Sequence, residues 1–318
     1  MRIRIAMALL VSILIARPCS AWWEGGHHLI AVMAYELLSE GEQHELQTIL
    51  AAHPRITEDF VPPIQVIGPE ETNLWRIGRA AYWPDVARSQ PKFTRPNWHF
   101  QLGATLAVGA PVNVPKISGA VPESATLDTE NLHIAQAVEL CRKVLRDKTR
   151  PNSDRALAIC WLAHLVGDAH QPCHSGSLYF AGIFPDGDRG ANFIPTKQSE
   201  NLHFLWDGLL GQQFDAGDVR HRSRTIVSES QLWSDAAKAA QKDGGLDPLT
   251  WLAESSEYGR SHVYTREVLS AVEAATRASQ KLEMIELSEG YLQGAGEVAR
   301  IRAAFAAHRL AAILRQGL

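Results

Sequence analysis

Two pairs of histidine and aspartate residues are the side chains of this sequence best suited to bind a metal ion. His164 and Asp168 stand four residues apart in WLAHLVGDAHQPCH, and His203 and Asp207 have the same spacing in NLHFLWD. Residues four apart share one face of a helix, so both side chains of a pair can reach one ion. Imidazole nitrogen and carboxylate oxygen are ligands of zinc. A single pair is more simply explained as a partly buried ion pair. Two pairs in apolar segments are harder to explain without a cation, because desolvating that many charges is costly.

Four further side chains could join such a centre: His27, Asp85, His99 and His174. His174 follows Pro172, which should end the preceding helix, so this imidazole would approach from a loop. His174 is a plausible ligand in that position, whereas His27, Asp85 and His99, each taken alone, are better explained by a structural role. Together with the two pairs they make eight candidate ligands, and five of the eight lie within three residues of a tryptophan. Bulky apolar neighbours keep a metal site dry and hold its ligands rigidly.

The sequence contains 13 histidines, and the remaining ones lack such partners. His28 and His170 stand beside candidate ligands and are expected to pack around them. The others are expected at the surface: His44, His53, His133, His221, His262 and His308.

Residues 1–21 have the pattern of a secretory signal peptide. Arg2 and Arg4 precede an apolar stretch from Ile5 to Ala16, and Cys19 and Ala21 are small residues at a cleavage site. The apolar stretch is shorter than the roughly 20 residues that span a bilayer. We therefore expect a secreted or periplasmic protein that begins at Trp22 and has no stable membrane association; the alternative is an uncleaved helix that tethers the chain.

Charge and cysteine content narrow the possibilities further. The 318 residues carry a formal net charge of −4, and removing residues 1–21 leaves 28 basic against 35 acidic residues, a net charge of −7. This balance disfavours a protein that holds nucleic acid by a basic surface alone. The three cysteines that remain cannot all pair within the chain, although Cys141 and Cys160 could form a disulfide.

The elements that must position these residues are mostly helical, because apolar residues recur at helical spacing and alternating patterns are scarce. The composition is that of a globular protein, and the chain contains no repeat and no convincing linker, which favours one all-α domain over residues 22–318. Helices are predicted at 29–38, 42–52, 74–88, 132–145, 153–169, 201–210, 228–241, 248–255 and 295–314, with loops at 61–69, 103–122 and 175–196.

In order and spacing, these motifs resemble those of the zinc-dependent single-strand-specific nucleases, the secreted fungal (S-one/P-one) and plant bifunctional nuclease type. The matching motifs are Trp22 followed five residues later by His27, the element Trp83–Asp85–Arg88, the pair His99–Phe100, the element His164–Asp168–His174, and His203 with Asp207. The resemblance covers essentially the whole chain after residue 21. It implies the mostly helical fold that this family shares with zinc-dependent phospholipase C, with three zinc ions in a cleft.

The resemblance also implies a role for each matching residue. One zinc ion would bind Asp85, His99, His164 and Asp168; a second would bind His27, a bridging Asp168, and the free amine and carbonyl of Trp22; the third would bind His174, His203 and Asp207. Arg88 would stabilise charge on the phosphoryl oxygens. Phe100 would stack on a base beside Asn192, and Tyr179, Phe180 and Phe184 could extend that platform or simply pack down their loop.

The activity implied is hydrolysis of single-stranded DNA and RNA to 5′-phosphorylated products, together with removal of phosphate from 3′-nucleotides, by a monomer. Three positions depart from the family. Leu102 replaces a base-recognising aspartate, so base preference is not predicted; Cys173 stands beside a ligand; and Ala191 replaces a glycine. The alternatives are a zinc-dependent phospholipase C and a secreted zinc-binding protein without turnover.

Overall fold

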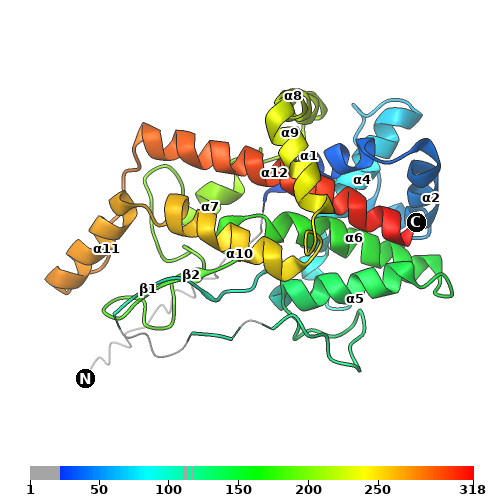
Figure 1. Ribbon diagram of the computed structural model, residues 1–318. Coiled ribbons are helices and arrows are strands. Elements are labelled where there is room, and N and C mark those ends of the chain that lie inside the picture. Colours follow the sequence, from blue (N-terminus) through cyan, green and yellow to red (C-terminus); the bar gives the residue numbers. More distant parts are fainter. Residues whose placement is uncertain (1–21, 110–113, 117) are drawn as a thin grey trace, which may run out of the picture.

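The computed structural model describes residues 22–109, 114–116 and 118–318, so the predicted signal peptide lies outside the described residues. Helices dominate the described chain (Figure 1). They are α1 (Glu24–Glu36), α2 (Glu40–Leu50), α3 (Ile56–Asp59), α4 (Pro69–Val86), α5 (Ile134–Arg146), α6 (Asn152–Ala169), α7 (Leu202–Asp207), α8 (Ala216–Ser228), α9 (Ser230–Gln241), α10 (Pro248–Tyr258), α11 (Arg266–Ala278) and α12 (Glu289–Gly317). The prediction of a mostly helical fold is confirmed.

Each predicted helix is present, and α3, α8 and α11 were not predicted. Helix α8 carries few apolar residues that would predict it, and one of its three buried residues, Ser223, is polar. Helix α12 begins before the predicted start at residue 295, since the Ser288 hydroxyl accepts the Tyr291 backbone N–H and so caps a longer helix.

Helix α6 is the centre of the larger hydrophobic core. Fourteen of its eighteen residues are buried, because α6 packs against α1, α4, α5 and α12, and these neighbours surround it in Figure 1. A helix that is apolar on every side is typical of such a central position. Two of its few polar side chains, His164 and Asp168, are therefore held inside the protein.

A second hydrophobic cluster forms around two short strands in segments that were predicted to be loops. Strands β1 (Ala104–Val108) and β2 (Ser177–Phe180) pair in parallel, and residues of β2, α7, α11 and the first half of α12 pack together beside them. The second half of α12 belongs to the larger core. Helix α12 thus joins the two clusters along its length, as its path across Figure 1 shows.

Several sequence-based expectations differ from the structure. His53 was expected at the surface but is buried against Phe60 and Trp83. Cys141 and Cys160 are buried free thiols, so the possible disulfide between them is not formed.

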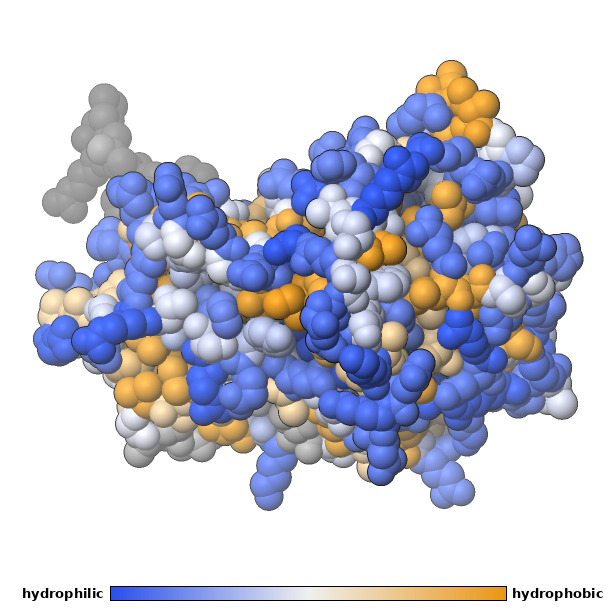
Figure 2. Space-filling view, turned by 45° about the horizontal axis from the view of Figure 1, so that its top comes forward, coloured by the Kyte–Doolittle hydropathy of each residue, from blue (hydrophilic) through white to orange (hydrophobic). Residues whose placement is uncertain are grey.

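Most of the face shown in Figure 2 is hydrophilic, with hydrophobic residues in scattered groups. Three of the most exposed apolar side chains, Val61, Ile64 and Ile67, lie in the segment between α3 and α4. Within the described residues, no helix combines the length and the apolar character needed to cross a bilayer.

Candidate metal centre

His164 and Asp168 lie on one buried face of α6 and form the middle of a cluster of histidines and aspartates. His164 Nε2 is 3.2 Å from Asp168 Oδ2, as expected for residues four apart on a helix. Helix α1 adds His27, whose ring stacks on that of His164 at 4.1 Å and whose Nε2 lies 3.5 Å from Asp168 Oδ1. The two oxygens of Asp168 thus face different histidines.

Asp85 and His99 approach the same aspartate from two other segments. Asp85 is in the last turn of α4, and its Oδ1 lies 3.9 Å from both His99 Nδ1 and His164 Nε2. His99 ends the short 3-10 helix Pro96–His99, and its Nδ1 lies 3.3 Å from Asp168 Oδ2 and 2.8 Å from His164 Nε2. Side chains from three other segments, α1, α4 and residues 96–99, therefore surround the His164–Asp168 pair of α6.

His174, His203 and Asp207 form a separate group of ligand atoms. His174 comes from the 3-10 helix Pro172–His174 after α6, while α7 supplies the other two. The Nε2 atoms of the two histidines are 3.0 Å apart, and Asp207 oxygens lie 3.4 Å from His203 Nε2 and 3.9 Å from His174 Nε2. Gln171, which the sequence did not single out, donates to Asp207 Oδ1 at 2.6 Å and so fixes this carboxylate.

Backbone carbonyls orient three of the imidazoles. The Nδ1 atoms of His164, His174 and His203 contact the carbonyl oxygens of Ala81, His99 and Gly190, respectively. A carbonyl can only accept, so each Nδ1 carries a proton, and in a neutral ring the lone pair is then on Nε2. In metal sites such a contact fixes both the tautomer and the orientation of the ring.

The charges and unmet hydrogen bonds of the cluster fit a cation. The ligand atoms of three sets, His27–His164–Asp168, Asp85–His99–His164 and His174–His203–Asp207, lie within 4.8 Å of one another in each set. Both nitrogens of His27 and both oxygens of Asp168, together with one oxygen each of Asp85 and Asp207, are buried without a hydrogen-bond partner. Unpaired buried polar atoms are costly, and a metal ion at each set would satisfy them. The residues therefore fit the metal ions that the sequence predicts.

Burial also sets the protonation states that metal binding needs. It lowers the pKa values of His27, His99 and His174 well below the ordinary value, with neighbouring cationic groups adding to the effect for each, so these imidazoles are neutral at pH 7. Burial raises the pKa of Asp168 to about 6 and that of Asp207 well above its usual range. In the absence of a cation, the cluster therefore disfavours the ionised carboxylates that a metal would stabilise.

Arg88 lies at the edge of the histidine–aspartate cluster and is more exposed than the candidate metal ligands. Its Nε donates to Asp85 Oδ1 at 2.6 Å and its Nη2 lies 3.2 Å from His99 Nδ1. The side chain is 16% exposed, whereas that of Asp85 is 2% exposed. A guanidinium in this position can contact an anion that approaches the cluster from solvent.

Trp22 is held between the two parts of the cluster. Its indole N–H donates to the Gly167 carbonyl, next to Asp168, and the backbone N–H of Trp23 donates to the Asp207 carbonyl. The ring of Trp22 is fully buried. Its predicted role as a ligand through a free amine and carbonyl stays a prediction, as do the ligand roles of the eight side chains.

The residues predicted to bind substrate differ in how far the structure leaves them exposed. Phe100 and Asn192 are half-buried, and the Phe100 ring lies 5.9 Å from that of His133. Tyr179 and Phe180, on β2, are 2% and 8% exposed, and Phe184 packs with Phe180 in the second hydrophobic cluster. This burial corrects the suggestion that these three rings extend a stacking platform, since a base needs an open ring face.

Tyr82 is a neighbour of the cluster that the sequence reasoning missed. It is half-buried on α4, one turn before Asp85, and its ring centroid lies 6.3 Å from that of His27. Burial, with Asp85 and Glu24 nearby, raises its pKa to about 12, so its hydroxyl stays protonated at neutral pH. Its spacing of three residues from Asp85 on a helix was the available signal.

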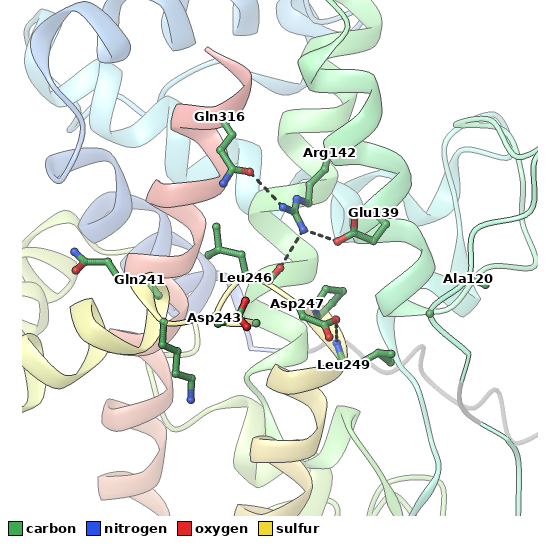
Figure 3. Close-up of a pocket in the computed structure, with 15 residues that line it drawn as sticks. Ala120, Glu139, Arg142, Gln241, Asp243, Leu246, Asp247, Leu249 and Gln316 are labelled. Carbon is green, nitrogen blue, oxygen red and sulfur yellow. Dashed lines mark hydrogen bonds and ion pairs between the residues drawn. The ribbon is translucent and has the colours of Figure 1, made fainter.

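A cavity of about 650 Å³ lies elsewhere in the protein, between α5, the segment joining α9 to α10, and the end of α12. Figure 3 shows Arg142 at its wall, donating to Glu139, to the Leu246 carbonyl and to Gln316. Its lining includes none of the candidate metal ligands. The functional candidates therefore remain with the histidine–aspartate cluster.

Comparison with known proteins agrees with this geometry. The family model described as S1/P1 Nuclease matches residues 22–318. The chain belongs to the S1/P1 nuclease family. It is similar to Nuclease S1 of Aspergillus oryzae, with 22% identity over 260 residues that make up 77% of each chain. It is also similar to Endonuclease 3 of Arabidopsis thaliana, with 24% identity over 157 residues, 45% of this chain and 51% of that protein. Endonuclease 4 of Arabidopsis thaliana is 38% identical over 56 residues, 17% of this chain and 16% of that protein.

Membership in the S1/P1 nuclease family establishes the general chemistry. The protein is a nuclease, a hydrolase that acts on phosphodiester bonds, and its family is zinc-dependent. The three histidine–aspartate sets are the groups of described residues that could hold such metal.

Proposed function

We propose that this protein is a zinc-dependent endonuclease that hydrolyses single-stranded DNA and RNA to 5′-phosphorylated products and also removes the phosphate of 3′-nucleotides. The observation that carries the proposal is the convergence of eight histidines and aspartates with buried side chains, among them Asp168 and Asp207, with the partly exposed Arg88 beside them. Family membership supplies the reaction class, and this geometry supports a phosphate ester as the bound group.

We assign three zinc ions to these ligands. One takes Asp85, His99, His164 and Asp168; a second takes His27, Asp168 and the amine and carbonyl of Trp22; the third takes His174, His203 and Asp207. Bound zinc supplies a Lewis acid and lowers the pKa of water toward neutrality. The buried atoms without hydrogen-bond partners support this assignment.

The protein's own side chains orient and bind the substrate. Arg88 donates hydrogen bonds to phosphoryl oxygens and stabilises the charge that grows on them, because guanidinium matches their geometry. Asp85 holds Arg88 through its short hydrogen bond and so fixes the direction of this donor. Phe100 offers a ring on which an unpaired base stacks, and Asn192 contacts the same nucleotide. Bases of a duplex must first unstack, which favours single strands.

The proposal includes export and processing before residue 22. Removal of residues 1–21 frees the Trp22 amine, which can then act as a ligand, so a secreted or periplasmic protein gains its second zinc site on cleavage. The processed chain acts as a monomer without stable membrane association. An N-terminally extended form that retained three zinc ions and full activity would contradict this part of the proposal.

The decisive experiment compares four substrates: RNA, single-stranded DNA, a 3′-nucleotide and phosphatidylcholine. We expect release from the first three, loss of all three activities in a strong chelator, and recovery on adding zinc. Duplex DNA serves as the control for strand preference. Preferential turnover of the lipid would favour a phospholipase C, metal binding without turnover would favour a zinc-binding protein, and nucleolysis indifferent to chelator would refute the proposal.

A further inference from the structure

The turn at residues 187–192, which follows β2, has an unusual backbone. Gly187, Arg189, Gly190 and Ala191 all have positive φ angles, from 58° to 85°. Arg189 and Ala191 are two of the three non-glycine residues with positive φ in the described chain. This conformation is costly for residues with a Cβ atom and persists only where the surroundings enforce it. Something must therefore hold the 187–192 turn in place.

The buried side chain of Asp188 holds the turn against its surroundings. Its carboxylate is completely buried, and Oδ1 accepts the Leu178 backbone N–H and the Tyr264 hydroxyl, both at 3.0 Å. The Asp188 backbone N–H donates to the Leu178 carbonyl at 3.0 Å. Asp188 thus ties the 187–192 turn to β2 and to the segment that precedes α11.

The 187–192 turn contacts the group formed by His174, His203 and Asp207. The Gly190 carbonyl accepts from His203 Nδ1, and the Ala191 carbonyl accepts the backbone N–H of the same histidine. Gly190 also packs directly on the backbone before His174, because a Cβ atom at this position would lie 2.1 Å from the Cys173 carbonyl oxygen. The 187–192 turn therefore contacts His203 and the residue directly before His174.

We propose that Asp188 is a positioning residue for the third metal site: it fixes the 187–192 turn so that Gly190 accepts the Nδ1 proton of His203. His203 Nε2 is then left unprotonated, 3.0 Å from His174 Nε2 and 3.4 Å from Asp207 Oδ2. The same turn carries Asn192, which is half-buried. This inference rests on the proposed function, in which His174, His203 and Asp207 bind zinc.

Burying a carboxyl group at this position costs desolvation free energy that a neutral asparagine would not lose. Burial raises the pKa of Asp188 to about 7, against the lowering effect of the backbone N–H groups of Ala191, Leu178 and Gly190 and of the Tyr264 hydroxyl. Burial thus makes the ionised form less favourable than it is in water, yet Oδ1 of this carboxyl group is the acceptor that joins two donors from different elements. This agrees with a carboxyl group that positions the turn rather than one that merely fills space.

The experiment compares Asp188→Ala with Val272→Ala, a matched control that removes a buried side chain from the same hydrophobic cluster. Zinc per chain and its affinity are measured by competition with a chromophoric chelator. Replacing a partner that orients a metal-binding histidine lowers affinity about 10- to 100-fold. We expect Asp188→Ala to weaken one of three zinc ions by at least about tenfold and to leave the other two unchanged. Val272→Ala should keep all three.

A second measurement does not depend on zinc. Nitrogen NMR of the imidazoles in the zinc-free proteins reports which nitrogen of His203 is protonated, and we expect Nδ1 in the wild type and a mixture in Asp188→Ala. Tyr264→Phe, which removes one hydrogen bond to Asp188 and keeps the ring, tests the same step if Asp188→Ala does not fold.

The outcomes separate the two proposals. A wild-type protein that binds no zinc would refute the proposed function, while the His203 tautomer would still test the role of Asp188. Unchanged affinity for all three ions with an unchanged tautomer would refute that role. Equal weakening in Asp188→Ala and Val272→Ala would also refute it, because a general loss of stability would then explain the effect.

Discussion

Replacement of Glu254 tests whether the buried charges that join α10 to α12 stabilise the protein as their geometry indicates. Glu254 accepts two hydrogen bonds from Arg309, at 2.7 and 2.8 Å, and one from Arg302 at 2.9 Å. The two arginines are 0% and 1% exposed. Arg309 also donates to His170 Nε2 and Arg302 to the His170 carbonyl, so the charges reach the end of α6, which carries Asp168.

The size of the effect follows from the pKa of Glu254. Burial alone would raise this pKa, but Arg309 and Arg302 outweigh it and lower the value from 4.5 to about 2. At about 1.4 kcal/mol for each pKa unit, the paired carboxylate contributes about 3 kcal/mol to the free energy of unfolding. Removing one partner of a buried ion pair costs about 3–5 kcal/mol in other proteins, which agrees.

The sign of the pH dependence is fixed by the direction of the shift. A lowered pKa in the folded state means that the stabilisation is complete above about pH 4.5, the value in the unfolded chain, and disappears as the pH falls through about 2. Glu254→Gln removes the charge and keeps the shape. The variant should therefore be about 3 kcal/mol less stable at pH 7, with a melting temperature lower by about 6–12 °C, and the difference should shrink below pH 4.

The assay is denaturant unfolding of the wild type and Glu254→Gln between pH 2 and pH 7. All samples contain chelator, so that acid does not act by releasing metal. Glu257→Gln is the control, because Glu257 is an exposed residue of the same helix and pairs at 3.5 Å with an exposed arginine; we expect a change below about 0.5 kcal/mol. A difference for Glu254→Gln under 1 kcal/mol at pH 7, or one of the same size at every pH, would refute the reasoning.

Three further predictions concern the metal centre and its surroundings. Arg88→Ala should lower kcat/KM about 10²- to 10³-fold while the zinc content stays unchanged. Arg88→Lys should recover only part of the activity, because lysine lacks the planar guanidinium group. Full activity in Arg88→Ala would count against a catalytic role. Chelation should lower the melting temperature and zinc should restore it, since a ligand at 100 times its Kd adds about 2.7 kcal/mol for each site; an unchanged melting curve would argue against metal binding. Gly190→Ala should destabilise the fold and weaken zinc binding, because the added Cβ would lie 2.1 Å from a carbonyl oxygen. Gly244→Ala is the control: its φ of 69° is similar, but no atom lies closer than 3.8 Å, so it should cost only about 1–2 kcal/mol of stability and leave zinc bound. Equal effects of the two variants would contradict the steric argument.

The sequence could predict the parts of the centre that depend on local geometry. His164 with Asp168, and His203 with Asp207, meet because residues four apart share a helix face, and both pairs lie within 3.5 Å in the structure. The fold class followed from helical spacing in the same way. Convergence of distant segments on Asp168 was not available from spacing, and the resemblance to a family supplied it.

What the sequence could not predict depends on tertiary packing. Strands β1 and β2 are far apart in the chain, and their parallel pairing becomes visible only when the fold brings them together. Tyr179 and Phe180 lie in a segment whose glycines and prolines are typical of an exposed loop, yet both side chains are buried because the segment forms strand β2. Histidine and arginine are residue types usually found at the surface, and His53 and Arg309 are buried because the partners packed against them offset the cost of removing these groups from water.

The charge of the whole chain says little about the charge that a substrate meets at the centre. The net charge of −4 and the three buried aspartates of the cluster would both repel a phosphate, and Arg88 is the one cation described within hydrogen-bond distance of these aspartates. Bound divalent cations are usually the largest local charges in a site and invert its electrostatics. A protein of this composition can therefore act on nucleic acid only if the attraction is concentrated in a small region and not spread over its surface. The histidines were the better guide in the sequence, because they report where neutral ligands can hold such cations without adding charge of their own.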